Sequence, residues 1–208
     1  MADIAIVVAT ELEAAGLAAS GTVGGASFLR VCTGVGPVNA AIALTRLLAT
    51  EEVGCVVSLG VGGAYPGSGL EPGEAVAAES ECYGDLGAAS PEGFLDMEAL
   101  GFPVVGGHYN TLPLDRFPCA RRAPFVTRST CTGSDAEARQ IVARTGGAVE
   151  SMEGAAVVHT AIAHGLPVGE VRGISNRVGN RDRSAWRLEE AAAAARRALT
   201  AWIEETAC

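Results

Sequence analysis

The stretch Gly147-Ala148-Val149-Glu150-Ser151-Met152-Glu153-Gly154 joins a short strand-like run to an Ala-rich segment of helical length. A second apolar run begins at Val168 and ends at Asn176. In an open α/β sheet, ligands bind at the carboxyl ends of the strands, because the loops diverge there and leave a crevice. The two strand ends therefore present a carboxylate, Glu153, and an amide, Asn176, where a ligand is expected.

The same alternation continues along the chain and predicts the fold class. Short runs rich in Val and Ile alternate with Ala- and Leu-rich stretches, and Gly or Pro lies at most of the joints. This pattern is typical of an α/β protein with a buried sheet. We predict strands over 3–9, 27–33, 53–60, 73–82, 124–129, 147–150 and 168–175, and helices over 11–19, 37–50, 134–145, 152–165 and 184–205.

The length of the chain sets its domain organisation. A chain of 208 residues fits a single domain over residues 1–208, large enough to bury roughly 70% of its unfolded surface. Residues 84–118 are rich in Gly and Pro and show little periodicity. We expect them to form irregular structure that covers one face and contributes to a pocket wall.

The charge composition excludes several classes of function. The net charge is −9, which would repel a phosphate backbone, so we expect no nucleic-acid partner. All 15 basic residues are Arg. A Lys Schiff base, a Walker-type phosphate Lys and a Lys general base are therefore excluded.

The spacing of the Cys and His residues indicates which cofactors to expect, and the first residues indicate the cellular compartment. The three His have no metal-binding spacing, and the six Cys contain no C-x-x-C pair. We expect no metal site, no organic cofactor, and reduced thiols in the core. The chain runs directly into an apolar stretch at residues 4–9, too short for a signal peptide or a membrane span. The sequence thus predicts a cytoplasmic protein without a membrane partner.

Two glycine-rich loops follow predicted strands, at residues 34–37 and 60–67. Glycine lets backbone N–H groups approach a ligand closely, which makes Val61, Gly62 and Gly63 candidate binding residues. A plain tight turn explains each loop equally well, because the Lys of a phosphate loop and the third Gly of a dinucleotide fingerprint are both missing.

The candidate acids have similarly ordinary explanations. Glu11 follows the first predicted strand, while Glu13 is expected further along the following helix. Acids in a first helical turn are common because the helix dipole favours them, and Asn176 could be a simple turn residue. Cys131 could be a nucleophile, but no His or Lys is near it in the sequence, so we interpret it as a packed thiol beside the substrate-lining Thr132.

Taken together, five segments resemble the nucleoside phosphorylase and nucleosidase superfamily, most closely its futalosine hydrolase branch. They are ATELE (9–13), GVGGAYPG (60–67), DLG (85–87), SMEGAA (151–156) and ISNRVGNRDRS (174–184). The resemblance spans nearly the whole chain, and the last two segments are the most specific. It implies a three-layer α/β/α sandwich on a twisted mixed sheet, and a homo-oligomer, dimeric or larger, in which neighbouring subunits often complete the pocket.

The resemblance also implies roles for individual residues. Glu11 matches the acid that activates the attacking water in the related nucleosidases. Glu153 matches the acid that binds the ribose hydroxyls, and Met152 matches the residue that packs on the sugar. Asn176 stands where those nucleosidases carry an Asp that binds adenine.

The chemistry of these side chains indicates the substrate. An amide both donates and accepts, which suits a 6-oxopurine, whereas a carboxylate suits the amino group of adenine. An acid rather than a cation after the first strand favours hydrolysis over phosphorolysis. Together with this chemistry, the resemblance to the futalosine hydrolase branch implies the hydrolysis of the N-glycosidic bond of futalosine, which releases hypoxanthine and dehypoxanthine futalosine for menaquinone biosynthesis.

Several alternatives stay open. The protein could be another purine nucleosidase of the methylthioadenosine/adenosylhomocysteine type, a purine nucleoside phosphorylase, or a non-catalytic purine-nucleoside-binding protein. Arg181 and Arg183 are candidates to bind the carboxylate of futalosine, with Trp186 packed on its ring. An Arg-Asp network that caps the last helix explains the same segment equally well.

Overall fold

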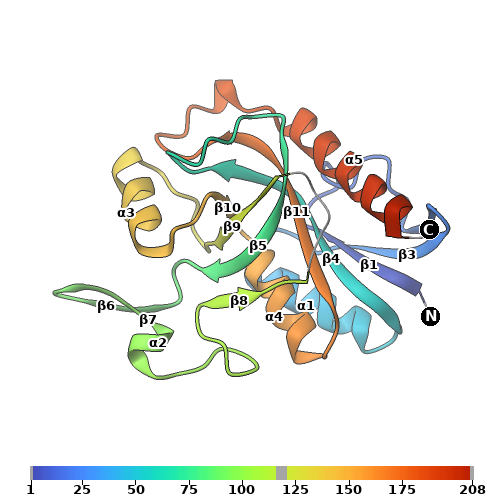
Figure 1. Cartoon of the computed structure of the whole chain (residues 1–208), viewed down its shortest axis with the longest axis horizontal. Coiled ribbons are helices and arrows are strands. Elements are labelled where there is room, and N and C mark those ends of the chain that lie inside the picture. The colour runs from blue at the N-terminus through green and yellow to red at the C-terminus, as the bar shows by residue number, and fades with distance from the viewer. Residues whose placement is uncertain (1, 116–120, 207–208) are drawn as a thin grey trace.

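The computed structural model describes residues 2–115 and 121–206, and its centre is a mixed sheet of nine strands (Figure 1). The strands of this sheet are β1 (Ala2–Val8), β2 (Ser20–Val23), β3 (Ala26–Cys32), β4 (Val53–Ala64), β5 (Ala75–Tyr83), β8 (Thr111–Pro113), β9 (Arg122–Thr127), β10 (Val149–Ser151) and β11 (Val168–Arg177). Their order is β10-β9-β5-β11-β4-β1-β3-β2, and β8 pairs with β5 outside this path.

Helices cover both faces of the sheet and complete the predicted α/β/α arrangement. The long helix α5 (Leu188–Thr206) lies on one face, and α1 (Pro37–Leu48) and α4 (Gly154–Ala163) lie on the other (Figure 1). Strand β1 shows why both faces need a cover. Ile4, Ile6 and Val8 pack in the cluster that contains α5, whereas Ala5 and Val7 pack in the cluster that contains α1 and α4. Alternate side chains of a strand point to opposite faces, so this uninterrupted apolar run requires a helix layer on each side.

One part of the sheet closes on itself, and this closure positions the site. β10 pairs parallel with β9 and antiparallel with β4, so β4, β11, β5, β9 and β10 form a ring. The register places Gly63 opposite Glu150 on one neighbouring strand and opposite Asn176 on the other. Two polar residues far apart in the sequence are thereby brought to adjacent strand ends.

The remaining helix of more than one turn, α3 (Asp135–Thr145), packs beside β9 through Ala138 and Ile141. Its N-cap is Ser134, whose side chain accepts a hydrogen bond from the backbone N–H of Glu137, and it ends at Gly146 with a φ of 67°. A serine cap and a left-handed glycine are the usual start and stop signals of a helix, which is why the sequence placed this element within one residue.

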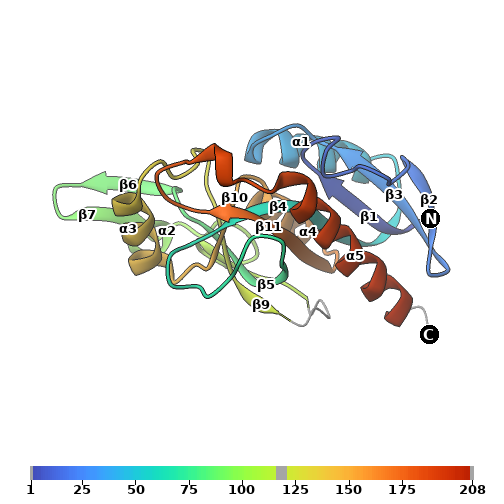
Figure 2. The ribbon, with the colours of Figure 1, turned by 90° about the horizontal axis from the view of Figure 1, so that it is seen from above.

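Two parts of the predicted secondary structure are wrong. The helix expected over 11–19 is absent, since residues 11–16 form turns, and Gly16 takes a φ of 85°. Residues 84–118 are more ordered than expected where the structure describes them. They contain the hairpin β6 (Gly87–Ser90) and β7 (Gly93–Asp96), the short helix α2 (Met97–Leu100) and strand β8, while residues 116–118 lie outside the described ranges. Figure 2 shows this hairpin extending from the end of the molecule opposite the two termini.

The cysteines differ from the expected core thiols. Cys32 is exposed, and Cys55, Cys82 and Cys131 are only partly buried, all four with free thiols. The other two, Cys119 and Cys208, lie outside the described residues. Across residues 2–115 and 121–206, no helix is long and apolar enough to cross a lipid bilayer.

Candidate active site

A cavity of about 390 Å³ opens where the carboxyl ends of β1, β4, β10 and β11 meet. It contains most of the residues that the sequence analysis selected. Those that line it are Val61, Gly62, Gly63, Thr132, Met152, Glu153, Asn176 and Arg181. Glu11, Arg183 and the described part of residues 84–118 do not line it, so the wall that was expected from 84–118 is wrong. The polar lining residues that were not predicted as site residues are Thr10, Glu13, Glu150, Ser151, Ser175 and Arg177.

Glu13 occupies the place that was predicted for Glu11. Its side chain is buried, and its carboxylate accepts hydrogen bonds from the backbone N–H groups of Ala9 at 3.1 Å, Thr10 at 2.9 Å and Val61 at 2.9 Å. The Thr10 hydroxyl donates to the same carboxylate at 3.0 Å and accepts from the backbone N–H of Glu13 at 3.4 Å. This reciprocal pattern is a capping box, and it turns Glu13 inward.

The predicted placement of the Glu11 side chain is therefore wrong. The side chain is 74% exposed and pairs with Arg30 at 3.0 Å outside the cavity. In a single capped turn, the residue directly after the cap points to solvent, while the third residue folds back to the strand end. The Thr-x-x-Glu spacing at residues 10–13 was the signal in the sequence that could have identified Glu13.

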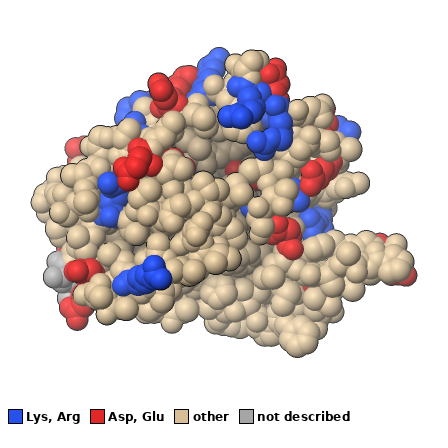
Figure 3. All heavy atoms as spheres, turned by 180° about the vertical axis from the view of Figure 1, so that it is seen from behind, with Lys and Arg blue, Asp and Glu red and all other residues tan. Residues whose placement is uncertain are grey.

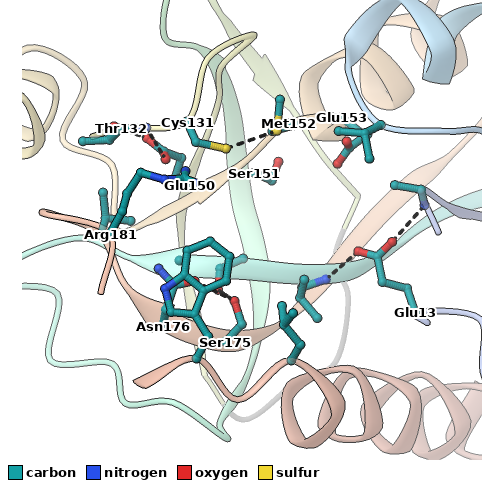
Figure 4. Close-up of a pocket in the computed structure, with 18 of the residues that line it drawn as sticks. Glu13, Cys131, Thr132, Glu150, Ser151, Met152, Glu153, Ser175, Asn176 and Arg181 are labelled. Carbon is teal, nitrogen blue, oxygen red and sulfur yellow. Dashed lines mark hydrogen bonds between the residues drawn. The ribbon is translucent and has the colours of Figure 1, made fainter. Parts of the chain in front are cut away.

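Glu153 lies at the N-terminus of α4, at the same end of the cavity as Glu13 (Figure 4). Its carboxylate accepts a hydrogen bond from the backbone N–H of Gly36 at 2.9 Å, so the glycine-rich loop at residues 34–37 serves to hold this acid. Burial raises the pKa of Glu153, and the charges of Glu13 and Glu170 add to this effect, while Arg172 and the Gly36 N–H oppose it. A carboxylate with a raised pKa is a strong hydrogen-bond acceptor, which suits contact with hydroxyl groups.

Behind the two acids lies a fully buried cation, Arg172, that sequence reasoning missed. Its Nη1 lies 3.8 Å from Glu13 Oε1 and 3.9 Å from Glu153 Oε2. Its Nε donates to Glu170 Oε1 at 2.7 Å, and its Nη2 donates to Ser58 Oγ at 3.0 Å. Burial by itself would lower the pKa of Arg172, but the surrounding carboxylates outweigh it and raise the pKa, so the guanidinium is always charged.

Glycine at position 60 makes this arrangement possible. A Cβ at Gly60 would lie 2.2 Å from Arg172 Nη1 and 2.3 Å from Glu13 Oε1. Both atoms belong to the buried ion cluster and have little room to move. This glycine of β4 therefore leaves room for charged side chains to pack, which is a more specific role than that of a tight turn.

The opposite end of the cavity carries Asn176, Glu150 and Thr132 (Figure 4). Asn176 Oδ1 accepts a hydrogen bond from Ser175 Oγ at 2.8 Å, and its Nδ2 donates to the carbonyl of Arg177 at 3.0 Å. One amide hydrogen and one lone pair of the Asn176 side chain remain for a ligand.

Glu150 is a residue of this end that the sequence analysis missed. Its carboxylate accepts hydrogen bonds from the Tyr65 hydroxyl at 2.6 Å, from the Thr132 backbone N–H at 2.9 Å and from the Thr132 hydroxyl. Burial, followed by the charge of Glu150, raises the pKa of Tyr65, which keeps the phenol a donor. Because its oxygens are largely used inside the protein, Glu150 holds the loop that carries Thr132.

The other predicted binding residues divide into those inside and those outside the cavity. Met152 Sδ lies 3.2 Å from Cys131 Sγ, and both residues contribute to the wall. Arg181, with a φ of 57°, lines the cavity with its guanidinium carbon 5.4 Å from the centre of the Trp186 ring. Arg183 lies over the same ring at 5.8 Å but is not part of the cavity lining, so its predicted place in the pocket is wrong. Figure 3 shows basic side chains gathered above a recess on the back of the molecule.

Comparisons with known proteins identify the family of the chain. The model of the phosphorylase superfamily matches residues 3–205. A futalosine hydrolase from Streptomyces coelicolor is 40% identical over 174 residues, which covers 79% of this chain and 73% of that protein. A futalosine hydrolase from Thermus thermophilus is 36% identical over 193 residues, which covers 87% of this chain and 83% of that protein.

The chain belongs to the futalosine hydrolases of the phosphorylase superfamily. Solved structures agree at the level of the fold. The 5′-methylthioadenosine/S-adenosylhomocysteine nucleosidase from S. pneumoniae, with a transition-state inhibitor, gives a TM-score of 0.84 at 19% identity, covering 97% of this chain and 98% of that one. The corresponding nucleosidase from Colwellia psychrerythraea, in complex with adenine, gives 0.83 at 20% identity, covering 97% and 94%. The futalosine hydrolase family and the methylthioadenosine nucleosidases thus share one architecture.

Proposed function

We propose that the protein hydrolyses the N-glycosidic bond of futalosine and releases hypoxanthine and dehypoxanthine futalosine, as part of menaquinone biosynthesis. The observation that carries this proposal is the division of one cavity into two ends. Two buried acids face an arginine at one end, and an amide with a free donor and a free acceptor lies at the other. The first end suits a cationic sugar and a water molecule, and the second suits a 6-oxopurine.

Glu13 is the proposed general base. Its carboxylate has a fixed orientation at the cavity wall, because it accepts hydrogen bonds from three backbone N–H groups and one hydroxyl. A water beside it attacks C1′ of the ribose and gives a proton to Glu13, while the bond from C1′ to the purine nitrogen breaks and its electron pair leaves with the base.

Glu153 is the proposed ribose-binding acid. Cleavage passes through a sugar with oxocarbenium character, so a carboxylate that accepts hydrogen bonds from the 2′- and 3′-hydroxyls binds more strongly as positive charge develops. Met152, the neighbouring residue in the cavity wall, is proposed to pack against the sugar.

Asn176 is the proposed base-binding residue. Its NH₂ donates to O6 of the purine, and its oxygen accepts a hydrogen bond from the N7–H of the departing base. The proton at N7 comes from solvent and neutralises the electron pair of the broken bond, so the base leaves as neutral hypoxanthine. The backbone of Val61, Gly62 and Gly63, together with Thr132, is proposed to shape the space around the base.

Hydrolysis is favoured over phosphorolysis by the charges around the attacking group. Every polar atom of Arg172 that faces the sugar end lies against Glu13, Glu153, Glu170 or Ser58. A phosphate dianion there would meet Glu13 and Glu153, and the described residues that line this end of the cavity include no cation to bind it. We infer that water, rather than phosphate, is the acceptor.

One experiment tests the function against the alternatives. The purified protein is incubated with futalosine, inosine and methylthioadenosine, with and without phosphate, and the products are identified. We expect hypoxanthine and a free reducing sugar from futalosine, at a rate that phosphate does not change. A sugar 1-phosphate would establish a phosphorylase, faster release of adenine would establish a methylthioadenosine-type nucleosidase, and binding without turnover would establish a binding protein.

Arg181 is proposed to bind the carboxylate of futalosine. Replacement of Arg181 by Ala should raise KM for futalosine about tenfold, since a charge-assisted hydrogen bond is lost, and should leave KM for inosine nearly unchanged. The matched control is Arg183→Ala, which removes a guanidinium from the same Trp186 ring outside the cavity. Equal effects on both substrates, or equal effects of the two variants, would contradict this role.

We also propose that the protein is a homo-oligomer in which a second copy covers the exposed apolar residues next to the cavity. The exposed fraction is 50% for Val35, in the loop before α1, and 68% and 46% for Val38 and Ile42 in its first turns. Val35 also lines the cavity. The variant Ile42→Glu should shift the protein to monomers in sedimentation measurements, whereas Gln140→Glu on the exposed face of α3 should not. A wild-type protein that sediments as a monomer would refute the assembly.

The cytoplasm is the proposed compartment, which cell fractionation would check.

A further inference from the structure

Two carboxyl groups lie deep behind the site and take no part in the proposed chemistry. Glu81 on β5 and Glu170 on β11 are both fully buried. They converge on Gly154, the first residue of α4: a Cβ added there would lie 2.0 Å from Glu81 Oε1 and 2.5 Å from each oxygen of Glu170. The two carboxyl groups are therefore neighbours, and only a glycine leaves room for them.

Each carboxyl group has one oxygen with partners and one without. Glu81 Oε2 accepts hydrogen bonds from the Cys82 backbone N–H at 3.0 Å and from the Thr127 hydroxyl at 3.1 Å. Glu170 Oε1 accepts from Arg172 Nε at 2.7 Å. Within the described residues, Glu81 Oε1 and Glu170 Oε2 are buried without a hydrogen-bond partner.

Two ionised carboxylates cannot satisfy each other, because both only accept. A single proton between them changes this, since a carboxylic acid donates to the neighbouring carboxylate and both unpaired oxygens gain a partner. Two like charges buried side by side would in addition repel strongly, which is the usual reason why such pairs share a proton.

The charged and polar groups around Glu81 also favour its protonated form. They are Glu170 and Arg172 on β11, Thr127 on β9, Tyr83 on its own strand, and Glu153 next to Gly154. Burial, then the charge of Glu170 and its hydrogen bond, raise the pKa of Glu81 well above the usual range, and the cation of Arg172 only partly offsets this.

We propose that Glu81 is a neutral carboxylic acid that donates a hydrogen bond to Glu170, and that this pair positions Arg172 against Glu13 and Glu153. Glu170 keeps its negative charge and holds Arg172 through Nε, while the proton on Glu81 fixes the other oxygen of Glu170. Arg172 Nη1 then faces the two acids of the cavity. Glu81 is thus a positioning residue, which acts on the substrate through Glu170, Arg172 and the two acids of the cavity.

The first test follows stability against pH and does not depend on the substrate. In the unfolded chain, Glu81 loses its proton near its ordinary pKa of 4.5. If the native state keeps the proton, the unfolded state binds fewer protons at Glu81 above this pH, so the contribution of Glu81 to the stability of the wild type falls as pH rises. Glu81→Gln has an amide that donates without titrating. Its Tm should therefore rise relative to the wild type as pH increases from about 5 to 8.

The control for this test is Glu79→Gln, which removes an exposed carboxylate from the same strand. Its Tm difference from the wild type should stay constant over the same pH range. A constant difference for Glu81→Gln as well would show that Glu81 is ionised in the native protein and would overturn the proposal. Infrared spectroscopy gives a second measurement, since the carbonyl band of a protonated acid at neutral pH should disappear in Glu81→Gln.

The second test concerns positioning and rests on the proposed function. Glu81→Leu removes the donor and leaves Glu170 Oε2 unpaired, so Arg172 is less well fixed, and kcat for futalosine should fall roughly 10- to 100-fold with a smaller change in KM. Glu81→Gln should recover kcat to within about threefold of the wild type, because the donor is restored. An equal loss in both variants would refute the positioning role. Lack of turnover by the wild type would instead refute the proposed function, and the pH test would still decide the state of Glu81.

Discussion

Replacement of Glu13 by Gln is expected to lower kcat for futalosine roughly 10³-fold, the range that a general base typically contributes. The amide keeps the shape of the side chain, and its oxygen can still accept from the Val61 or Thr10 N–H, but it cannot take a proton from water. KM should change much less than kcat, since Glu153 and Asn176 still bind the substrate. Steady-state kinetics with futalosine, with hypoxanthine as the measured product, would check this.

Glu11→Gln is the matched control for Glu13→Gln. It makes the same substitution two residues away in the same turn, but its side chain is exposed and pairs with Arg30 outside the cavity. We expect kcat within about twofold of the wild type, because an exposed ion pair contributes little. The opposite result, a large loss from Glu11→Gln and a small one from Glu13→Gln, would return the general base to Glu11.

The contrast between Glu11 and Glu13 illustrates what local sequence can and cannot predict. The apolar period of the chain correctly predicts the major strands, because continuous Val and Ile runs are needed for a sheet that is covered on both faces. It also predicts α1, α3, α4 and α5. It fails at residues 11–19, where a capped turn is followed by the left-handed Gly16 and no helix forms. A difference of one turn decides which of two acids faces the cavity.

Other parts of the site depend on contacts that no local pattern contains. Arg172 lies inside an apolar strand run, and nothing nearby in the sequence marks it as the partner of Glu13 and Glu153. Glu81 and Glu170 meet only because β5 and β11 pair in the ring of strands. The pairing of β10 with β4 similarly brings Glu150 to the base end. Each motif by itself also had an ordinary structural explanation. Only the resemblance of all the motifs to one family predicted that they form a single site.

Asn176→Asp is expected to lower kcat/KM for futalosine by at least about 100-fold, because a site that loses a required donor discriminates strongly against its ligand. The carboxylate has no hydrogen for O6 of hypoxanthine and would place two acceptors in contact. The residue is half-buried at the end of β11, so the variant should fold. Competition between futalosine and its 6-amino analogue would measure the change in base preference.

The same substitution should raise the preference for a 6-aminopurine, since an ionised Asp at position 176 accepts from an amino group at C6. Ser175 should hold the new carboxylate in the orientation of the amide. Its hydroxyl donates to Oδ1 of Asn176 at 2.8 Å and can donate equally to a carboxylate oxygen at the same place. Asn39→Asp, an exposed change of the same kind in α1, should leave the preference unaltered. If Asn176→Asp also leaves it unaltered, the amide does not read the base, and the choice of hypoxanthine must come from the backbone around Val61, Gly62 and Thr132.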